Sequence, residues 1–407
     1  MPTTKTKIAI NVFAFAFLLK LSIRLRCKMR MHQAHNLRRI PINMDKVRFG
    51  IIGVGVMGKA HAESFFNEQV QDGVLTAVYD IDPLQLEWLE DKEDVTIYNS
   101  ASDMFKSGKI DAVLIATPHY FHPPIAMEAM ANKLHVMIEK PAGVYTQQVR
   151  EMNEIAAKTD TTFAIMYQER TKSVYKKMRE IVQSGKLGEI KRTNWIITTW
   201  YRSQAYYNTG GWRATWKGEG GGVLLNQCPH NLDLWQWICG MPSKVTAFCH
   251  EGKWHDIEVE DDVTAYVEYP NGATGVFVTS TADAPGSNRF EITGDMGKLV
   301  FEDDKLTLYS LSQSERAFNK ENTEMFGAPE WKKTSIRHDG EYSAHPGTLS
   351  AFIDKILGRG ELIAGGEEGI NGLTISNAMH LSSWLGKTIP LPLDEELFLK
   401  ELRKKYK

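Results

Sequence analysis

The stretch MDKVRFGIIGVGVMG, residues 44–58, decides the fold of the first half of this 407-residue chain. An apolar run over residues 47–52 ends in a turn that holds three glycines, and a segment with helical character follows. Gly53 permits a tight turn, Gly55 lets the backbone approach a pyrophosphate, and Gly58 lets the helix pack closely on the strand. This order of strand, glycine turn and helix predicts a crossover that binds a dinucleotide.

The residues after the glycine turn extend this prediction. Val56 and Met57 begin the helix, whose free N–H groups and partial positive charge favour phosphate. The next strand, residues 75–79, ends in Asp80, about 20 residues beyond the last glycine, as the fingerprint expects. Asp80 would accept hydrogen bonds from the adenosine ribose and repel a 2′-phosphate, and no arginine follows it directly. We therefore expect NAD rather than NADP as the cofactor.

Strands and helices alternate over residues 44–166. Apolar and β-branched runs predict strands at residues 95–98, 111–116, 135–138 and 163–166, and helical patterns lie at residues 123–131 and 147–157. Alternation of this kind predicts an α/β domain with a doubly wound, mostly parallel sheet.

The pattern changes over residues 167–407, where we expect a second domain of α+β type. Asn271-Gly272, between two strand-like runs, predicts a hairpin. Further strands are expected at residues 191–200, 290–293, 297–301 and 305–309, with helices at residues 174–183, 348–357 and 370–385. These strands favour an antiparallel sheet, and this domain is expected to bind substrate.

The composition is that of an ordinary globular protein, and it narrows the function classes. The formal net charge is −2 and 24% of the residues are charged, which gives no support for nucleic-acid binding. The four cysteines show no CxxC pairing, so neither a zinc site nor a disulfide framework is indicated. His119 and His122 lie in a turn without carboxylate or thiol partners, and we expect no metal there.

The first 43 residues are expected to lie outside the fold, disordered or upstream of the true start at Met44. Residues 8–19 are apolar and follow Lys5 and Lys7, as in a signal-peptide core. They are too short to span a bilayer comfortably, and a basic run follows in place of a cleavage site. An export signal or membrane anchor is the alternative. An NAD-dependent enzyme needs a compartment that contains NAD, so we expect the cytoplasm and no membrane partner.

The carboxyl ends of the strands in a doubly wound sheet face one crevice, so residues distant in sequence become neighbours there. Tyr167 and Arg170, after the last strand, are expected to contact substrate. Each residue alone could be a turn residue, but their convergence favours a site. The cofactor side of this crevice is expected to contain Thr117, Pro118, His119, His122, Glu139, Lys140 and Gln168.

Lys140 is the strongest catalytic candidate. Pro141 biases Lys140 toward an extended backbone, and burial beside a cationic nicotinamide ring would lower the pKa of the lysine. It could then exchange a proton with a substrate hydroxyl while hydride moves to the ring. Asn226, His230 and Asp233 are spaced four and three apart, and they share one face if this stretch is a helix. His230 is then a candidate acid or base, with a structural histidine as the alternative.

Two aromatic segments flank the expected site. They contain Tyr206 and the pair Trp212-Arg213. Aromatic faces stack on the apolar C–H surface of sugar rings, while arginine bonds hydroxyls. Core packing at the domain junction is the alternative for each tryptophan.

The motifs together resemble the glucose–fructose oxidoreductase / inositol dehydrogenase (Gfo/Idh/MocA) family from Met44 to the C-terminus. The matching elements, in order, are GIIGVGVMG, ATPHYFH, EKP, GGGVLLNQCPHNLD and ITGDMGKL. The resemblance implies a Rossmann domain followed by an open-faced antiparallel sheet, and homodimers or homotetramers through that sheet. It also implies catalysis by Lys140 and His230 on a carbohydrate: a sugar, polyol or glycoside.

One departure from the family pattern bears on the chemistry. The family usually has aspartate at position 226 and glycine at position 228, where this chain has Asn226 and Cys228. An amide cannot take up a proton or pair with Lys140, but it can orient a hydroxyl. We therefore expect Asn226 and Asp233 to contact substrate while Lys140 and His230 share the acid–base work.

Three functions are compatible with these observations. The first is an NAD-dependent sugar, polyol or glycoside dehydrogenase. The second is an enzyme that retains NAD and cleaves or modifies glycosides through a keto intermediate. The third is a non-catalytic dinucleotide-binding regulator, against which the intact Glu139-Lys140-Pro141 motif argues.

Overall fold

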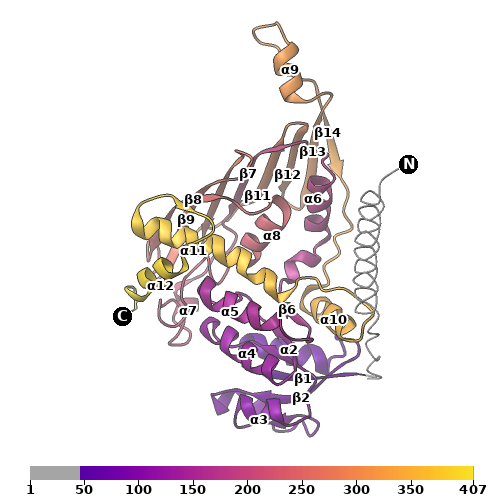
Figure 1. Ribbon diagram of the computed structural model, residues 1–407, viewed down its shortest axis with the longest axis vertical. Helices are drawn as coiled ribbons and strands as arrows, with labels where there is room; N and C mark the ends of the chain where they lie inside the picture. Colours follow the sequence, from indigo (N-terminus) through magenta and orange to yellow (C-terminus); the bar gives the residue numbers. More distant parts are fainter. Residues whose placement is uncertain (1–45, 407) are drawn as a thin grey trace, which may run out of the picture. The chain divides into compact units, whose positions relative to one another are not determined.

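The computed structural model describes residues 46–406 (Figure 1). The expectations for the first 43 residues therefore lie outside the described residues. No described helix combines the length and the apolar character that crossing a membrane requires.

The first half of the described chain forms a six-stranded parallel sheet, as predicted. Its strand order is β3-β2-β1-β4-β5-β6, in which the order reverses between β1 and β4. That reversal leaves a crevice at the carboxyl ends of β1 and β4, where ligands bind in doubly wound folds. The strands are β1 (Val47–Ile52), β2 (Gly73–Tyr79), β3 (Thr96–Ile97), β4 (Ala112–Ile115), β5 (His135–Ile138) and β6 (Phe163–Ile165).

Helices connect these strands and cover the sheet. All four residues of β4 are buried, because a central parallel strand is packed on both faces. Asp82 caps the short helix at Pro83–Gln85 by accepting a hydrogen bond from the Leu84 amide. The connecting helices are α2 (Val56–Phe66), α3 (Ala101–Lys106), α4 (His122–Ala131) and α5 (Thr146–Ala156).

The second half is built on a nine-stranded sheet with the order β14-β13-β12-β11-β7-β10-β9-β8-β15. Neighbouring strands are antiparallel, as expected, except β7 and β10, which are parallel. The hairpin at Asn271-Gly272 is confirmed: Gly272, at φ +84°, closes the turn between β9 and β10. The strands are β7 (Ile190–Ile197), β8 (Lys244–Glu251), β9 (Glu260–Glu268), β10 (Thr274–Ser280), β11 (Asn288–Gly294), β12 (Gly297–Glu302), β13 (Lys305–Leu311), β14 (Trp331–Ile336) and β15 (Ile389–Pro390).

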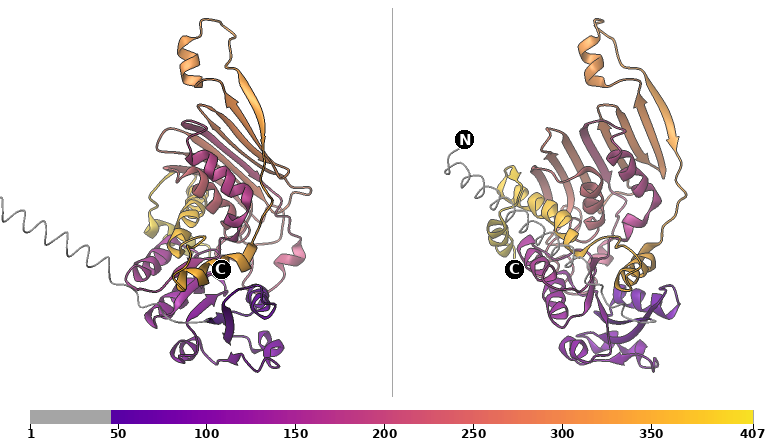
Figure 2. Two further views of the ribbon diagram at one scale, coloured as in Figure 1. Left: turned by 90° about the vertical axis from the view of Figure 1, so that its right-hand side faces the viewer. Right: turned by 45° about the vertical axis from the view of Figure 1, so that its right-hand side comes forward.

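Helices cover one face of this sheet and leave the other open, as Figure 2 shows. On the open face, Ile196 and Tyr266 are each 41% exposed, whereas their strand neighbours Trp195 and Val267 are fully buried. The helices of this half are α6 (Ser173–Gln183), α7 (Gln204–Tyr207), α8 (Pro229–Cys239), α9 (Glu315–Glu321), α10 (Ala344–Ile356), α11 (Gly369–Leu385) and α12 (Glu395–Arg403).

The last helices tie the two sheets together. The ring of Phe352, in α10, lies 6.1 Å from the ring of Phe49 in β1. The side chain of Asn377, in α11, accepts a hydrogen bond from the Thr146 amide at 3.2 Å and donates one to the Val144 carbonyl at 3.0 Å. Helix α11 also packs along α8. The loop after β5 and the start of α8 are therefore held by the same helix.

Candidate active site

The glycine turn after β1 has the shape that close backbone approach requires. Gly53 has φ +84°, and a Cβ there would lie 2.7 Å from the Ala116 carbonyl oxygen. A Cβ on Gly58 would lie 1.8 Å from the carbonyl oxygen of Gly53, so only glycine permits α2 to pack here. A Cβ on Gly55 would meet nothing within 4 Å, which leaves open space at the N-terminus of α2.

The surroundings of this turn fit a dinucleotide. Asp80, at the end of β2, accepts a hydrogen bond from the Val54 amide at 2.6 Å, so its carboxylate lies at the glycine turn. Two apolar side chains near this turn are exposed: Val56, the first residue of α2, is 87% exposed, and Ile81, directly after Asp80, is 88% exposed. Free helix N–H groups, open space and a carboxylate for the ribose match the pyrophosphate and adenosine parts of NAD.

Lys140 follows β5 and reaches across to the second half of the chain. Its Nζ donates a hydrogen bond to the backbone oxygen of Asn226 at 3.0 Å. Burial lowers the pKa of Lys140, while the carboxylates of Glu139 and Glu219 oppose the shift. A lysine in such surroundings exchanges a proton more readily near neutral pH than a solvated one.

Glu139 and His122 are buried polar residues that hold the loops around Lys140 through hydrogen bonds. Glu139 accepts a hydrogen bond from His61 Nε2 at 2.6 Å, and although burial opposes it, this bond lowers the pKa of Glu139 to about 2. His122 joins two loops, because its ring nitrogens lie 2.8 Å from the Pro141 oxygen and 2.7 Å from the Thr117 oxygen. Both side chains thus have protein partners, and cofactor contact through them stays a prediction.

The stretch after the glycine run is not one helix, which corrects our expectation. Helix α8 begins at Pro229, because proline fits the first turn of a helix but not its interior. Asn226 therefore lies in the turn before α8, whereas His230 and Asp233 lie on it. The three residues do not share one helix face.

His230 lies near the start of α8 with one free ring nitrogen. Its Nε2 lies 3.1 Å from the side-chain nitrogen of Gln168, and its Nδ1 has no hydrogen-bond partner. Burial, and then the charge of Lys140, hold the pKa of His230 well below its usual value. The imidazole is therefore neutral at pH 7, and because Nε2 accepts from the Gln168 amide, Nδ1 carries the proton and is free to donate one hydrogen bond.

Arg170 and Asp233, both expected to contact substrate, instead form a buried ion pair. Arg170 Nε and a terminal nitrogen donate to the two carboxylate oxygens of Asp233 at 2.7 and 2.6 Å. The other terminal nitrogen donates to Glu368 at 2.8 Å. Because these groups bond one another, the geometry favours a role in holding α8, and with it His230.

A buried carboxylate that the sequence reasoning missed lies beside Asn226. Glu219 accepts a hydrogen bond from the Asn226 side-chain nitrogen, and another from the Ala214 amide at 2.7 Å. Burial raises the pKa of Glu219, against these hydrogen bonds. The side-chain oxygen of Asn226 lies 3.3 Å from the Tyr206 hydroxyl, so both ends of the amide have partners. The only hint in the sequence was an acidic residue directly before the glycine run 220–222.

The aromatic segments divide between core and site. Trp216 is buried, whereas Trp212 is partly exposed and its ring lies 5.8 Å from that of His119. Arg213 donates to the Tyr206 hydroxyl at 2.7 Å. His119 Nδ1 lies 3.1 Å from the backbone oxygen of Glu219, and burial holds the pKa of His119 well below its usual value. Tyr206 thus contacts Asn226, and Arg213 and Trp212 lie next to Tyr206. Their contact with substrate stays a prediction.

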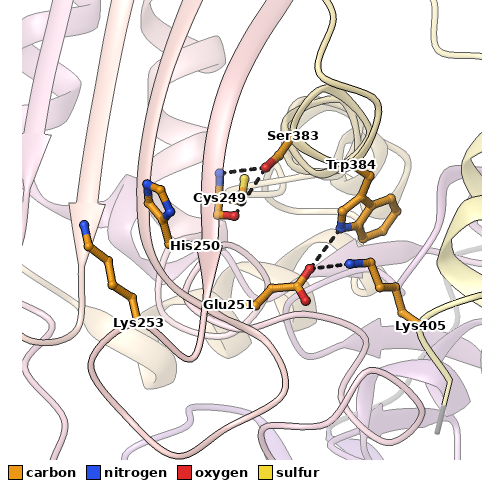
Figure 3. Close-up of a pocket in the computed structure, with 7 residues that line it drawn as sticks. All are labelled: Cys249, His250, Glu251, Lys253, Ser383, Trp384 and Lys405. Atoms are coloured by element: carbon orange, nitrogen blue, oxygen red, sulfur yellow. Dashed lines mark hydrogen bonds and ion pairs between the residues drawn. The ribbon is translucent and has the colours of Figure 1, made fainter.

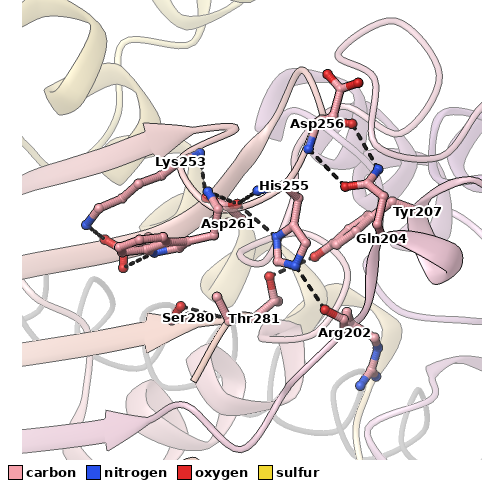
Figure 4. A network of polar contacts seen from close by, with 12 residues as sticks. Arg202, Gln204, Tyr207, Lys253, His255, Asp256, Asp261, Ser280 and Thr281 are labelled. Carbon is pink, nitrogen blue, oxygen red and sulfur yellow. Dashed lines mark hydrogen bonds and ion pairs between the residues drawn. The ribbon is translucent and has the colours of Figure 1, made fainter. Parts of the chain in front are cut away.

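A polar network holds the segment that carries Tyr206 (Figure 4). Asp261, in β9, accepts hydrogen bonds from the amides of residues 253–255 and from His255 Nδ1 at 2.9 Å. His255 Nε2 in turn lies 2.9 Å from the backbone oxygen of Arg202. Gln204 bonds the backbone of Asp256 twice. This network holds residues 202–207 against the loop that precedes β9.

Several buried polar atoms around Lys140 have no partner among the described residues. Each would cost free energy if it stayed unpaired, so the set indicates a place for a ligand. No group of three or more metal-ligating side chains lies within the described part of the chain. The unpartnered atoms are Thr117 Oγ1, Gln168 Oε1, Arg213 Nε, Gln227 Oε1 and His230 Nδ1.

A separate pocket of about 520 Å³ lies at the end of β8 (Figure 3). Glu251 accepts hydrogen bonds from Trp384 at 3.2 Å and from Lys405 at 2.7 Å. The charges of Glu251 and Lys405 are therefore paired with each other. None of the residues predicted for the site lines it. The lining residues are Cys249, His250, Glu251, Lys253, Ser383, Trp384 and Lys405.

Two family descriptions match the chain, one in each half. Residues 47–167 match "Oxidoreductase family, NAD-binding Rossmann fold" and residues 175–300 match "GFO/IDH/MocA C-terminal domain".

Characterised relatives are similar at moderate identity. The rhizopine catabolism protein MocA of Rhizobium meliloti is 27% identical over 48% of this chain and 58% of its own length. The D-glucoside 3-dehydrogenase of Escherichia coli is 26% identical over 85% of this chain and 97% of its own length. Among solved structures, the WlbA dehydrogenase of Bordetella pertussis, in complex with NADH and UDP-GlcNAcA, is 26% identical with a TM-score of 0.71. That likeness covers 86% of this chain and all of the other.

We predict that Asp233→Asn destabilises the protein by about 3 kcal/mol, because a buried cation loses its main partner. Urea unfolding followed by tryptophan fluorescence measures the change. The matched control is the double variant Arg170→Met/Asp233→Leu, which removes both charges and should cost less. An Asp233→Asn variant as stable as the wild type would contradict the structural role.

Proposed function

The chain belongs to the GFO/IDH/MocA family of NAD-binding oxidoreductases, and from that premise we propose that it is a carbohydrate dehydrogenase. It would oxidise a secondary hydroxyl of a sugar, polyol or glycoside with NAD. The similar D-glucoside 3-dehydrogenase supports this substrate class. A cofactor that is abundant in the cytoplasm supports a cytoplasmic location.

One observation carries the proposal: the charge of Lys140 acts on His230, whose own Nδ1 is buried without a partner in the described chain. Lys140 bonds the backbone oxygen of Asn226, and His230 lies four residues further along the chain. Nδ1 of His230 and Oε1 of Gln168 are both buried without a partner. A substrate hydroxyl and a nicotinamide amide are groups that could satisfy them.

In the proposed mechanism, NAD when bound supplies the hydride acceptor. Lys140, in its neutral form, accepts the proton of the reacting hydroxyl at Nζ, which its low pKa permits. His230 donates a hydrogen bond from Nδ1 to the same or the adjacent hydroxyl and acts as the acid partner of Lys140. Asn226 keeps Lys140 in place through its backbone oxygen. Arg170 and Asp233 position His230 by fixing α8.

Glu219 supplies the negative charge that the family usually carries at position 226. The Asn226 amide donates to this carboxylate, whereas an aspartate at position 226 would set two carboxylates against each other. The charge of Glu219 raises the pKa of Lys140 against the effect of burial. The amide of Asn226 and the carboxylate of Glu219 are therefore complementary to each other.

We predict that Lys140→Ala lowers kcat/KM for sugar oxidation by about 10³-fold, the usual contribution of a general base. Absorbance of NADH at 340 nm measures turnover across monosaccharides, inositols and glycosides, and NADH fluorescence shows that the variant still binds cofactor. Lys158→Ala, an exposed lysine of the same domain, is the matched control. Near-full activity in Lys140→Ala would end the catalytic assignment, and reduced cofactor co-purifying with the wild type would favour the retained-NAD alternative.

We predict opposite pH shifts for Glu219→Gln and Asn226→Asp. Oxidation needs neutral Lys140, so kcat/KM rises with pH up to the pKa of that lysine. Removing the Glu219 charge lowers the pKa of Lys140 and moves this rise to lower pH. Asn226→Asp adds a carboxylate and should move the rise to higher pH. Unmoved profiles in both variants would contradict the electrostatic role of Glu219.

We also propose that two copies pair through the open face of the nine-stranded sheet. Phe248 is 64% exposed there and lies in one row across the sheet with Thr264, Val278 and Ile196. Apolar patches of this kind mark interfaces. A stable interface buries about 1,600 Å² in total, which a sheet of this size can provide.

We predict that the protein in solution is a dimer or tetramer and that Ile196→Lys/Phe248→Lys shifts it to monomer. Light scattering after size exclusion measures the mass. The control Phe326→Lys changes a more exposed aromatic residue outside the open face, in the loop between α9 and β14. A monomeric wild type, or a control variant that dissociates as readily, would refute the interface.

A further inference from the structure

The substrate side of the site has an excess of positive charge. Lys140, Arg202 and Arg213 act on one another there, since both guanidinium groups lower the pKa of the lysine. Glu219 is the carboxylate that faces them, and its oxygens already accept hydrogen bonds from Ala214 and Asn226. Glu139, the residue before Lys140, is bonded to His61 and also raises the pKa of Lys140. Three basic side chains thus stand beside two carboxylates, both of which already have partners.

Arg213 is held in place but only partly satisfied. One terminal nitrogen donates to the Tyr206 hydroxyl at 2.7 Å and lies 3.7 Å from Glu219, beyond hydrogen-bond distance. Its guanidinium carbon lies 4.5 Å from the centre of the Tyr206 ring and 4.8 Å from that of Trp212. Its Nε is buried and has no partner. Stacking thus fixes the plane of the guanidinium while donors remain free.

Arg202 has no carboxylate partner within 4.0 Å among residues 46–406. Its one side-chain hydrogen bond, at 2.8 Å, is to the backbone oxygen of the preceding Tyr201. The guanidinium carbon lies 5.0 Å from the centre of the Tyr206 ring. Figure 4 shows the backbone oxygen of Arg202 bonded to His255 while the guanidinium extends away from the network. The backbone of Arg202 is therefore held by His255, whereas its guanidinium charge has no carboxylate partner among residues 46–406.

Tyr206 links this cationic pair to the reacting centre. Its ring contacts both guanidinium groups, and its hydroxyl lies 3.3 Å from the side chain of Asn226. The backbone oxygen of Asn226 in turn accepts the hydrogen bond from Lys140. One residue thus separates the free guanidinium groups from the residue that bonds Lys140. That spacing fits a second substituent on the sugar ring whose hydroxyl reacts.

Within the described chain, Arg202 has no ion pair and Arg213 only a long one, to Glu219 at 3.7 Å, so the two guanidinium groups repel each other and a bound anion offsets the repulsion. Arginine in particular presents a planar set of donors that matches carboxylate and phosphate oxygens. A neutral sugar can accept hydrogen bonds from the guanidinium groups, but it cannot compensate their positive charge.

We propose that the substrate is an anionic carbohydrate whose carboxylate or phosphate group binds Arg202 and Arg213. This inference rests on the proposed dehydrogenase function, and it narrows the substrate class of the same site. The acidic group lies on the ring that is oxidised or directly attached to it. Hydride transfer and proton uptake by Lys140 are unchanged by this group.

Matched sets of substrates test the proposal. For each of several hexoses, the neutral sugar, the hexuronate and the hexose 6-phosphate are assayed with NAD at the same pH and ionic strength. We expect kcat/KM for one anionic member to exceed that of its neutral counterpart by about 100-fold, as a charge-assisted pair provides. The uronate and phosphate arms show which acid is bound. Added NaCl should lower the preference, because exposed charge pairs are screened.

Arg213→Gln and Arg202→Gln give the second measurement. Each should lower the anionic-to-neutral ratio of kcat/KM by about tenfold or more. Arg202 makes no ion pair, so its variant is expected to fold normally even if the Arg213 variant does not. Arg192→Gln, on β7 outside the site, is the control and should leave the ratio unchanged.

Two outcomes overturn the inference, and they are distinguishable. Equal kcat/KM for neutral and anionic members in every set would refute the anionic substrate and leave the dehydrogenase function standing. No NAD reduction with any neutral or anionic carbohydrate would refute the proposed function together with this inference.

Discussion

The hydrogen bond between Lys140 Nζ and the backbone oxygen of Asn226 joins the two halves of the site. Lys140 comes from the end of a parallel strand, and Asn226 from the turn before α8. A backbone oxygen holds the amine without neutralising it, whereas a carboxylate at this place would keep it charged. The lysine can therefore be fixed in position and still have a pKa low enough to accept a proton. The chemistry of the site depends on this combination.

That bond is possible only because buried polar groups away from the site hold the Asn226 turn. The carboxylate of Glu260 accepts hydrogen bonds from the amides of Gly222 and Leu224 at 2.9 and 3.0 Å, and it lies 3.1 Å from His380 of α11. A Cβ on Gly222 would lie 1.9 Å from the Glu260 backbone oxygen, so the glycine run is needed for this approach. The same helix, α11, binds the loop after β5 through Asn377. One helix thus contacts both segments that carry the proposed acid–base residues, Lys140 and His230.

The sequence predicted the parallel sheet well because its signals are local. The glycine turn and the run of β4 are determined by neighbouring residues, and those predictions are confirmed. Asn226, His230 and Asp233 were expected to share one face only if their stretch is a helix, and that condition is not met because α8 begins at Pro229. Glu219 was missed because its importance comes from a contact with Asn226. The role of a buried polar residue depends on its interaction partners in the fold, and the spacing of residues in the sequence does not reveal those partners.

Arg170 and Asp233 show how such partners divide a polar motif between support and chemistry. Each has the residue type and the spacing of a substrate-binding group, yet together they are saturated and buried. Arg202 and Arg213 have the same chemical type but lack carboxylate oxygens within hydrogen-bond distance. A guanidinium whose donors are already bonded to carboxylates holds the fold, whereas one that is fixed but keeps free donors retains a favourable interaction for a ligand. The inference that Arg202 and Arg213 bind substrate while Arg170 supports the site rests on this difference.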